Sequence, residues 1–392
     1  MARALLHRDD DQSRVARLAA GFTSGWAAVR LRQWSGYSAG RFPGADPFPL
    51  PASEPKLTVA VTGPTGTFGF GLMPLLQANE RIARVIGIAR RPFDPGEQGW
   101  TKMDYRRGDV RDAASLEQAF EGAEVVVHLA FLITGTASRE TIRAINVEGT
   151  LNAFRAAARV GAKRFVYASS VAAYGFHADN PMGMTEEWPV RPAAHLFYAQ
   201  EKAEIEELLH EEARAHPELG LYLLRPPIVL GPHAVGAKTT RPAAPESIAR
   251  RLAGLVNRLP VPLPMVAPSL PMQFIHEEDV GQAFLLCIVG AGPPGAYNIT
   301  GDGVLTGTQV ARQLGLAPVP VPARLVQAAA RTVAALPLTP AATEWAEAAS
   351  HPSIMDASKA KSELGWSPRY TSLEALRDSL PRRGRLTRGA GQ

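Results

Sequence analysis

Short apolar runs alternate with segments of helical periodicity along most of this chain. Five apolar runs rich in β-branched residues are expected to be strands: Leu57–Thr62, Arg84–Ala89, Glu124–Leu129, Arg164–Ser169 and Leu221–Leu224. Between them, amphipathic patterns predict helices over about 114–120, 138–160 and 197–215. Because apolar strands separated by amphipathic helices are typical of a parallel sheet covered on both faces, the pattern predicts an α/β protein.

A glycine-rich turn follows the first of these strands. Gly63, Gly66 and Gly69 are spaced three apart, and Leu72, Leu75 and Leu76 continue with helical periodicity. A turn of this kind binds the pyrophosphate of a dinucleotide, because the glycines permit a tight turn, a close approach of the backbone to phosphate and helix packing on the strand. The N-terminus of the helix then supplies N–H groups and a positive dipole end. We expect the residues between these glycines to hold the cofactor as well: Thr65, Thr67 and Phe68. A glycine-rich surface turn is the alternative.

The second half of the chain has a different texture. Beyond Gly231 it is proline-rich, with an expected strand at Gln273–Ile275 and helices at Glu277–Val289 and Asp356–Leu364. We predict a Rossmann-type doubly wound parallel sheet over residues 56–230 and a smaller, mainly substrate-binding α/β region over 231–380, with strands that return to the main sheet. Residues 1–55 are expected to form a partly ordered arm that ends in a proline-dense stretch, and residues 381–392 a basic flexible tail.

Composition and charge exclude several function classes. The net charge is +5 and the arginines are scattered, so we expect a solvated surface and no nucleic-acid partner. The single cysteine, Cys287, lies in an apolar run, which excludes an intrachain disulfide. No apolar run approaches the length of a transmembrane segment, and no signal peptide is recognisable. We therefore expect a cytoplasmic protein.

Candidate catalytic residues gather around the start of the 197–215 helix. Tyr198 and Lys202 are four residues apart, so they share one helix face. A free phenol has a pKa of about 10, and a nearby ammonium favours the phenolate, so Tyr198 could exchange a proton with a substrate hydroxyl or carbonyl. Ser169 and Ser170 end an apolar strand, at the edge where open parallel sheets bind ligands. A surface Tyr–Lys pair and a capping serine are the alternatives.

The order of glycine turn, strand-end serine and Tyr-x-x-x-Lys resembles the extended short-chain dehydrogenase/reductase family, which contains nucleotide-sugar epimerases and dehydratases. The resemblance runs from about Lys56 to about Asp378. It includes seven further motifs in the family's order: Gly108–Val110, His128–Ala130, Asn146–Thr150, Leu224–Pro232, Phe274–Val280, Tyr297–Ile299 and Leu364–Pro368. The resemblance implies that Tyr198 is the acid/base, that Ser170 rather than Ser169 holds the substrate oxygen, and that Lys202 also binds the nicotinamide ribose.

Further positions gain a role from the same resemblance. Asp109 and Val110 would flank the adenine, Leu129 and Ala130 would line the central ribose, and Asn146 would shape the site from a neighbouring helix. The family's four-helix dimer interface implies a homodimer through the 138–160 and 197–215 helices. Its apolar positions here would be Leu151, Phe154, Ile205 and Leu208. The alternative is that these four residues face their own sheet.

Three departures from the family pattern carry information. Members that prefer NAD place an acid at the end of the second strand, where this chain has Ala89 followed by Arg90 and Arg91, which favours NADP over NAD. Dehydratases carry Asp-Glu after the catalytic hydroxyl, and this chain has Val171 and Ala172, so we do not expect a dehydratase. Ile228 replaces an asparagine of the nucleotide-sugar epimerases, which resembles the branch that acts on hydroxysteroid-like or other apolar ketones.

The sequence thus predicts an enzyme with a small-molecule substrate. We expect an NAD(P)-dependent oxidoreductase or epimerase that transfers hydride at a secondary alcohol or ketone carbon. The alternatives are a nucleotide-sugar epimerase similar to UDP-glucose 4-epimerase and, in another class, a non-catalytic dinucleotide-sensing or scaffold protein. The acidic run His276–Asp279 suits the first turn of a helix, so we expect no metal.

Overall fold

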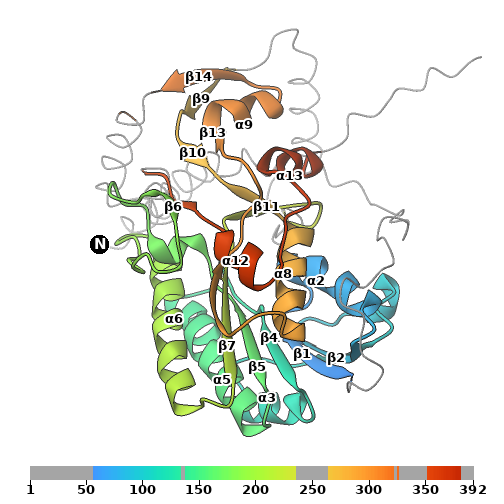
Figure 1. The fold of residues 1–392 in the computed structure, drawn as a ribbon. Coiled ribbons are helices and arrows are strands. Elements are labelled where there is room, and N and C mark those ends of the chain that lie inside the picture. The colour runs from blue at the N-terminus through green and yellow to red at the C-terminus, as the bar shows by residue number, and fades with distance from the viewer. Residues whose placement is uncertain (1–55, 134–136, 235–263, 322–324, 326–350, 381–392) are drawn as a thin grey trace, which may run out of the picture.

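A seven-stranded parallel sheet forms the centre of the computed structural model, which describes residues 56–133, 137–234, 264–321, 325 and 351–380 (Figure 1). The expected arm at 1–55 and the tail at 381–392 lie outside the described residues. The strands are β1 (Leu57–Thr62), β2 (Ile82–Ala89), β3 (Met103–Arg107), β4 (Val125–His128), β5 (Arg164–Ala168), β7 (Gly220–Arg225) and β12 (Gly295–Asn298).

The strand order is β12-β7-β5-β4-β1-β2-β3, and each neighbouring pair is parallel. The order of the first strands reverses between β1 and β4, so their carboxyl ends face a topological switch point, which is where open α/β sheets bind ligands. The predicted Rossmann-type fold is confirmed.

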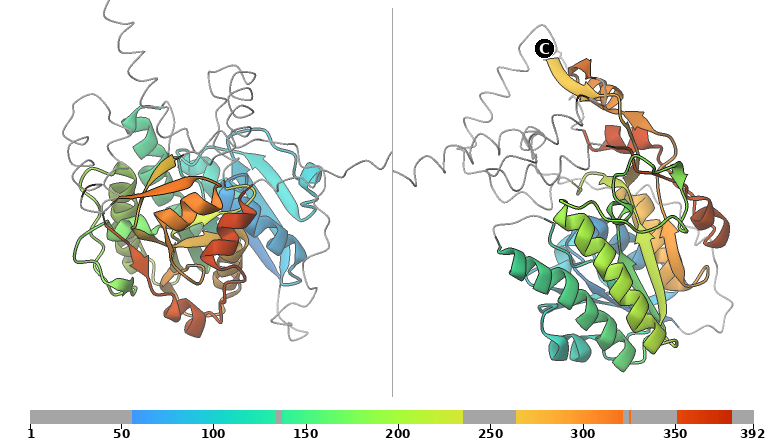
Figure 2. Two further views of the ribbon diagram at one scale, coloured as in Figure 1. Left: turned by 90° about the horizontal axis from the view of Figure 1, so that it is seen from above. Right: turned by 90° about the vertical axis from the view of Figure 1, so that its left-hand side faces the viewer.

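Helices cover both faces of the sheet (Figures 1 and 2). One face packs on α3 (Ala113–Phe120), α5 (Gly149–Arg159) and α6 (Phe197–Ala215), and the other on α2 (Thr67–Ala78), α8 (Glu277–Val289) and α12 (Ser358–Glu363). Successive residues of β1 alternate between the two cores: Val59 and Val61 pack with α2 and α8, and Ala60 packs on the opposite side. The continuous apolar strand runs of the sequence follow from burial on both faces.

Helix α8 crosses α2 at a contact between glycines. A Cβ atom on Gly71 would lie 2.1 Å from the carbonyl oxygen of Glu277, and one on Gly281 would lie 2.2 Å from the carbonyl oxygen of Gly71. Only glycine allows the two backbones to approach this closely. Residues after 230 therefore supply both a helix layer and, through β12, an edge strand of the main sheet.

Shorter elements lie beyond the carboxyl ends of the main strands, at the top of Figure 1. Among the described residues, small two-stranded sheets pair β9 (Pro264–Pro268) with β14 (Ala317–Val321), β10 (Pro271–Met272) with β13 (Leu305–Thr306), β8 (Ile228–Leu230) with β11 (Phe274–His276), and β6 (Met182–Met184) with β15 (Ile354–Met355). Helices α9 (Gly307–Gln313) and α13 (Ser372–Asp378) pack with them. In the part of the chain that the structure describes, no helix is long and apolar enough to cross a membrane.

The expected long helix and the expected dimer contacts differ in the structure. The helix predicted over 138–160 consists of α4 (Arg139–Arg143), a π-helical turn (Ala144–Glu148) and α5. Of the residues proposed for a dimer interface, Phe154 and Ile205 are fully buried in the core beneath their own sheet, so they cannot supply such a contact. Leu151 and Leu208 are only partly buried, and the homodimer stays a prediction.

Candidate active site

In the turn between β1 and α2, two of the three glycines are required by packing within the protein, and the third leaves space for a ligand. Gly63 has a φ of 71°, and a Cβ atom there would lie 2.9 Å from the backbone of Ala130. A Cβ atom on Gly69 would lie 1.9 Å from the carbonyl oxygen of Pro64. At Gly66 the nearest atom would be the carbonyl oxygen of Gly63 at 3.4 Å, an ordinary contact. The protein itself therefore needs glycine at 63 and 69, and position 66 leaves space open beside the start of α2.

The start of α2 is suited to an anion. Gly66 is the N-cap and has no side chain to bond the free N–H groups, and no acidic residue lies in the first turn. The Thr67 hydroxyl is buried, and among the described residues its oxygen has no hydrogen-bond partner. Because buried polar atoms almost always have a hydrogen-bond partner, the Thr67 hydroxyl is suited to bond a polar group of a ligand. These residues fit the pyrophosphate of a dinucleotide.

The residues expected at the ribose lie next to this turn. The backbone N–H of Leu129 donates to the carbonyl oxygen of Thr62 at 3.0 Å, and that of Ala130 to the Thr62 hydroxyl at 3.4 Å. The pairing of β1 with β4 thus places Leu129 and Ala130 beside Gly63 at the carboxyl edge of the sheet.

Arg90 and Asp109 follow the neighbouring strands β2 and β3. Arg90 is exposed, and the Arg107 side chain donates to its carbonyl oxygen at 3.1 Å. The Asp109 carboxylate accepts two hydrogen bonds from the Arg111 guanidinium, which together with the charge of Arg90 lowers the pKa of Asp109. Val110 is buried against Gly149 at the start of α5. The structure thus places Arg90, Asp109 and Val110 together at the end of the sheet expected to hold the adenosine.

Ser170 and Tyr198 meet at the carboxyl end of β5. Ser170 is the N-cap of a 3-10 turn (Val171–Tyr174), and its hydroxyl accepts from the N–H of Ala172 at 3.1 Å. Tyr198 is the second residue of α6, and its ring lies edge-on to Phe131, with centroids 5.6 Å apart. Burial raises the pKa of Tyr198 to about 12, and a hydrogen bond from the Ser170 side chain lowers it only in part.

Lys202 lies one turn further along α6 and is 3% exposed. Its Nζ donates to the Tyr167 hydroxyl at 3.0 Å and to the carbonyl oxygen of Ala168 at 2.7 Å. It also lies 3.6 Å from the centroid of the Phe131 ring and 5.8 Å from that of Tyr198. The expectation that Lys202 favours the Tyr198 phenolate stays a prediction. Burial is the largest influence on the pKa of Tyr198 in this structure, and it raises that pKa.

A buried ion pair that the sequence analysis did not identify supports this end of the sheet. Arg225 donates to both carboxylate oxygens of Glu206, from Nε at 2.9 Å and from a terminal nitrogen at 2.5 Å, and both side chains are at most 4% exposed. Ser169 donates to Glu206, and Arg225 also donates to the Tyr174 hydroxyl at 2.6 Å. The Ser169 hydroxyl is therefore used in a structural hydrogen bond to Glu206, and Ser170 is the serine that bonds Tyr198.

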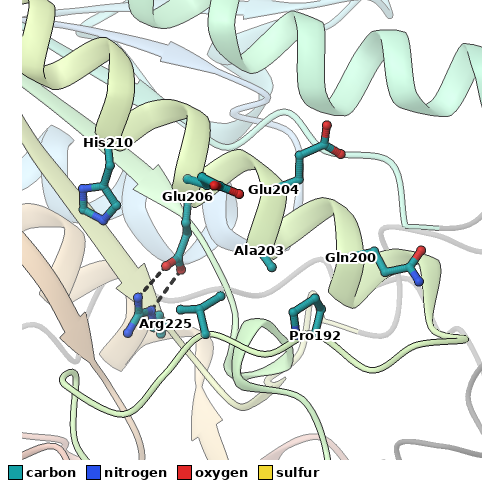
Figure 3. A pocket seen from close by; sticks show the side chains of 9 residues that line it. Pro192, Gln200, Ala203, Glu204, Glu206, His210 and Arg225 are labelled. Atoms are coloured by element: carbon teal, nitrogen blue, oxygen red, sulfur yellow. Dashed lines mark hydrogen bonds and ion pairs between the residues drawn. The ribbon is translucent and has the colours of Figure 1, made fainter.

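A cavity of about 530 Å³ lies on another flank of α6, and Figure 3 shows the side chains that line it. The Glu206–Arg225 pair forms part of its wall, and Pro192 faces Ala203 across it. Its remaining lining residues are Val190, Gln200, Glu204, Glu207 and His210. Ser170, Tyr198 and Lys202 do not line this cavity, so it is separate from the candidate active site.

Residues 59–300 match the model of the NAD dependent epimerase/dehydratase family, which is more than half of the chain. This chain belongs to that family. The resemblance inferred from the motifs is confirmed, and the matched range holds the glycine turn and the Ser170, Tyr198 and Lys202 group.

Two relatives and two solved structures show the range of similar proteins. An uncharacterized protein of Mycobacterium tuberculosis is 28% identical over 335 residues, 84% of this chain and 85% of that protein. Sterol demethylase protein B of Methylococcus capsulatus is 32% identical over 180 residues, 45% of this chain and 52% of that protein. A dTDP-glucose 4,6-dehydratase from Bacillus anthracis in complex with NAD has a TM-score of 0.60 at 18% identity, covering 82% of this chain and 95% of that one. A UDP-glucose 4-epimerase from Thermotoga maritima has a TM-score of 0.61 at 20% identity, covering 82% and 97%. The two structures share the fold.

Proposed function

We propose that this protein is an NAD(P)-dependent oxidoreductase or epimerase that transfers hydride at a secondary alcohol or ketone carbon. The observation that carries the proposal is the meeting of Ser170, Tyr198 and Lys202 at the carboxyl end of β5, on the same sheet edge as a glycine turn that fits a pyrophosphate. A phenol, a second hydroxyl and a buried ammonium form a set suited to proton exchange at one oxygen atom.

The roles follow from the protonation states. A bound nicotinamide supplies the hydride acceptor or donor. Because the pKa of Tyr198 is raised to about 12, its hydroxyl carries a proton at neutral pH and can donate it to a carbonyl oxygen. Ser170 holds the same oxygen by a hydrogen bond. The Lys202 ammonium stabilises negative charge that develops there.

The surroundings of the site favour an apolar substrate. Ile228 follows the carboxyl end of β7, and its side chain is 51% exposed, so it presents an apolar group where the nucleotide-sugar epimerases carry an asparagine. Val171 and Ala172 after Ser170 offer no acid or base for the elimination of water. The similarity to sterol demethylase protein B agrees with a ketone or alcohol on an apolar skeleton.

For the cofactor we propose a preference for NADP over NAD. Arg90 places an exposed guanidinium beyond β2, and Ala89 removes the carboxylate that would repel a 2′-phosphate. The nearby Asp109 carboxylate forms an ion pair with Arg111. Its negative charge is thus balanced by Arg111, and the positive charge of Arg90 can attract a phosphate group.

The test is a change in the absorbance of the reduced cofactor over a panel of apolar alcohols and ketones and of nucleotide sugars. We expect turnover with apolar ketones, and a loss of a hundredfold or more in Tyr198→Phe, as is typical for an acid/base group. Tyr222→Phe is the matched control, because that hydroxyl bonds the carbonyl oxygen of Gly292 away from the site. Turnover of nucleotide sugars would favour the epimerase alternative, and no turnover across the panel would favour a non-catalytic protein.

A further inference from the structure

Phe131 contacts two of the three residues proposed for catalysis, and neither the family motif at His128–Ala130 nor the proposed reaction uses it. It lies three residues beyond the end of β4. The centroid of its ring is 3.6 Å from Nζ of Lys202 and 5.6 Å from the centroid of the Tyr198 ring, and the two rings are perpendicular, at 89°. One aromatic side chain therefore adjoins both the ammonium and the phenol of the candidate site.

The Lys202 ammonium lies over the face of the Phe131 ring. An aromatic face carries partial negative charge and attracts a cation, more strongly where water is excluded. Lys202 is 3% exposed, so this contact is largely shielded from water. The Tyr167 hydroxyl and the carbonyl oxygen of Ala168, both in β5, accept hydrogen bonds from the same ammonium. Groups from two neighbouring strand ends thus contact it together.

The backbone next to Phe131 is held by a buried asparagine. Asn146 lies in the π-helical turn and is fully buried. Its side-chain oxygen accepts from the N–H of Leu132 at 2.8 Å, and its side-chain nitrogen donates to the carbonyl oxygen of Leu132 at 3.0 Å. The same nitrogen donates to the Glu201 carboxylate at 2.7 Å. The segment that carries the ring is thereby tied to α6, the helix that carries both contacted residues.

Packing alone is the other explanation of this ring. Phe131 is half-buried and packs against the apolar core between the sheet and α5, which any apolar side chain of similar size would also do. An aliphatic side chain would fill the space without attracting an ammonium. The two explanations therefore differ in what an aliphatic replacement does to Lys202.

We propose that Phe131 is a positioning residue: the face of its ring holds the Lys202 ammonium and the ring packs against Tyr198, so that the charge and the phenol keep a fixed relative place at the reacting oxygen. The catalytic part of this role rests on the proposed function, and the contact with Lys202 does not. Phe131→Leu removes the aromatic face and keeps an apolar side chain. Phe131→Tyr keeps the face, and because the ring is half-buried it has room for a hydroxyl.

The first test is an NMR spectrum of the Lys202 side chain in the full chain, without cofactor or substrate. The seven lysines are labelled with ¹³C, and the Lys202 signal is assigned by its absence in Lys202→Arg. Protons over an aromatic face are shielded, so we expect the ε-methylene protons to move downfield in Phe131→Leu and to keep their position in Phe131→Tyr. The Tyr167 ring, 4.7 Å from Nζ, contributes in every variant.

The matched control for this spectrum is Phe93→Leu. It makes the same substitution at a ring that packs against Trp100 and Tyr105, towards the β3 edge of the sheet. The Lys202 signal should stay in place. An unchanged Lys202 signal in Phe131→Leu would overturn the proposed contact.

The second test is kinetic and uses a substrate from the panel. We expect Phe131→Leu to lower kcat about three- to thirtyfold, as for the loss of one desolvated cation–π contact, with KM changed by less than about twofold. Phe131→Tyr should restore kcat to within about twofold of the wild type. An equal loss in the two variants, or no loss in Phe131→Leu, would overturn the positioning role.

The two tests keep this proposal distinct from the proposed function. If the wild type turns over no substrate of the panel, the catalytic part falls together with the proposed function, and the NMR spectrum still decides the contact with Lys202. If Phe131→Leu fails to fold, Phe131→Met carries both tests, because its flexible side chain fills a similar volume without an aromatic face. The same results are then expected, and the same results overturn the proposal.

Discussion

Substitution of Gly66 by alanine should weaken cofactor binding without lowering the stability of the fold. The backbone of Gly66, with φ −91° and ψ 175°, is accessible to any residue. The added Cβ atom would meet only the carbonyl oxygen of Gly63, at 3.4 Å. We therefore expect Gly66→Ala to leave the free energy of unfolding unchanged or to raise it by about 0.4–1 kcal/mol, because alanine restricts the unfolded chain.

The same methyl group points into the space expected to hold the pyrophosphate. Because the backbone must approach the phosphates closely, we expect cofactor affinity to fall at least about tenfold, which corresponds to about 1.4 kcal/mol. Gly69→Ala is the contrasting variant. Its Cβ atom would lie 1.9 Å from the carbonyl oxygen of Pro64, so the turn and helix must separate, at a cost of about 1–3 kcal/mol or more in stability.

The assay combines urea unfolding with titration of NADPH and NADH, followed by cofactor fluorescence. The expected result is a stable Gly66→Ala protein that binds either cofactor weakly, and a Gly69→Ala protein that is destabilised even without cofactor. A Gly66→Ala protein that binds cofactor as tightly as the wild type would refute the assignment of this turn to the pyrophosphate.

Three further predictions concern single residues. In Arg90→Ala the affinity for NADPH should fall about ten- to hundredfold while that for NADH stays constant, and the wild-type preference should shrink as salt is raised; equal affinities in the wild type would contradict a 2′-phosphate contact. Arg225→Ala leaves the Glu206 carboxylate buried and unpaired, so urea unfolding should show a loss of about 3–5 kcal/mol, and a loss below about 1 kcal/mol would rule the pair out as a support of the sheet. Burial raises the pKa of Asp279 to about 6, so the folded state binds this proton more readily than the unfolded state, and the stability of the wild type relative to Asp279→Asn should increase as the pH falls from 7 to 4; a constant difference would contradict the shift.

The sequence pattern predicted buried elements well and edge elements poorly. The bounds of α6 and α8 agree with the prediction at both ends, because each has a sustained helical period. Strand β3 was not predicted, since its sequence Met-Asp-Tyr-Arg-Arg lies at the edge of the sheet and is mostly half-buried. The π-helical turn at Ala144–Glu148 has no proline or glycine inside it to mark it, so no local signal was available.

The sequence indicated which residues gather at the candidate site, whose roles stay predictions, but it did not indicate the electrostatic effects around them. The spacing of Tyr198 and Lys202 predicted that they share one helix face. In the structure Tyr198 lies beside Ser170, and the Lys202 ammonium lies 5.8 Å from the centroid of the Tyr198 ring. The pKa of Tyr198 is raised by burial, which comes from tertiary packing that the spacing does not reveal; the ring of Phe131 is one of its neighbours there. The Glu206–Arg225 pair joins residues 19 positions apart, and a buried glutamate in a charged helix has no signature that distinguishes it from its exposed neighbours.

Hydride transfer itself can be followed with deuterium. An alcohol from the substrate panel, labelled with deuterium at its carbinol carbon, is incubated with the wild-type protein and oxidised cofactor, and the products are analysed by mass spectrometry. The account predicts that the deuterium passes to the cofactor ring or, in an epimerase, returns to the same carbon, and that Tyr198→Phe slows this transfer by a hundredfold or more. Loss of the deuterium to water, or equal transfer by Tyr198→Phe, would contradict it.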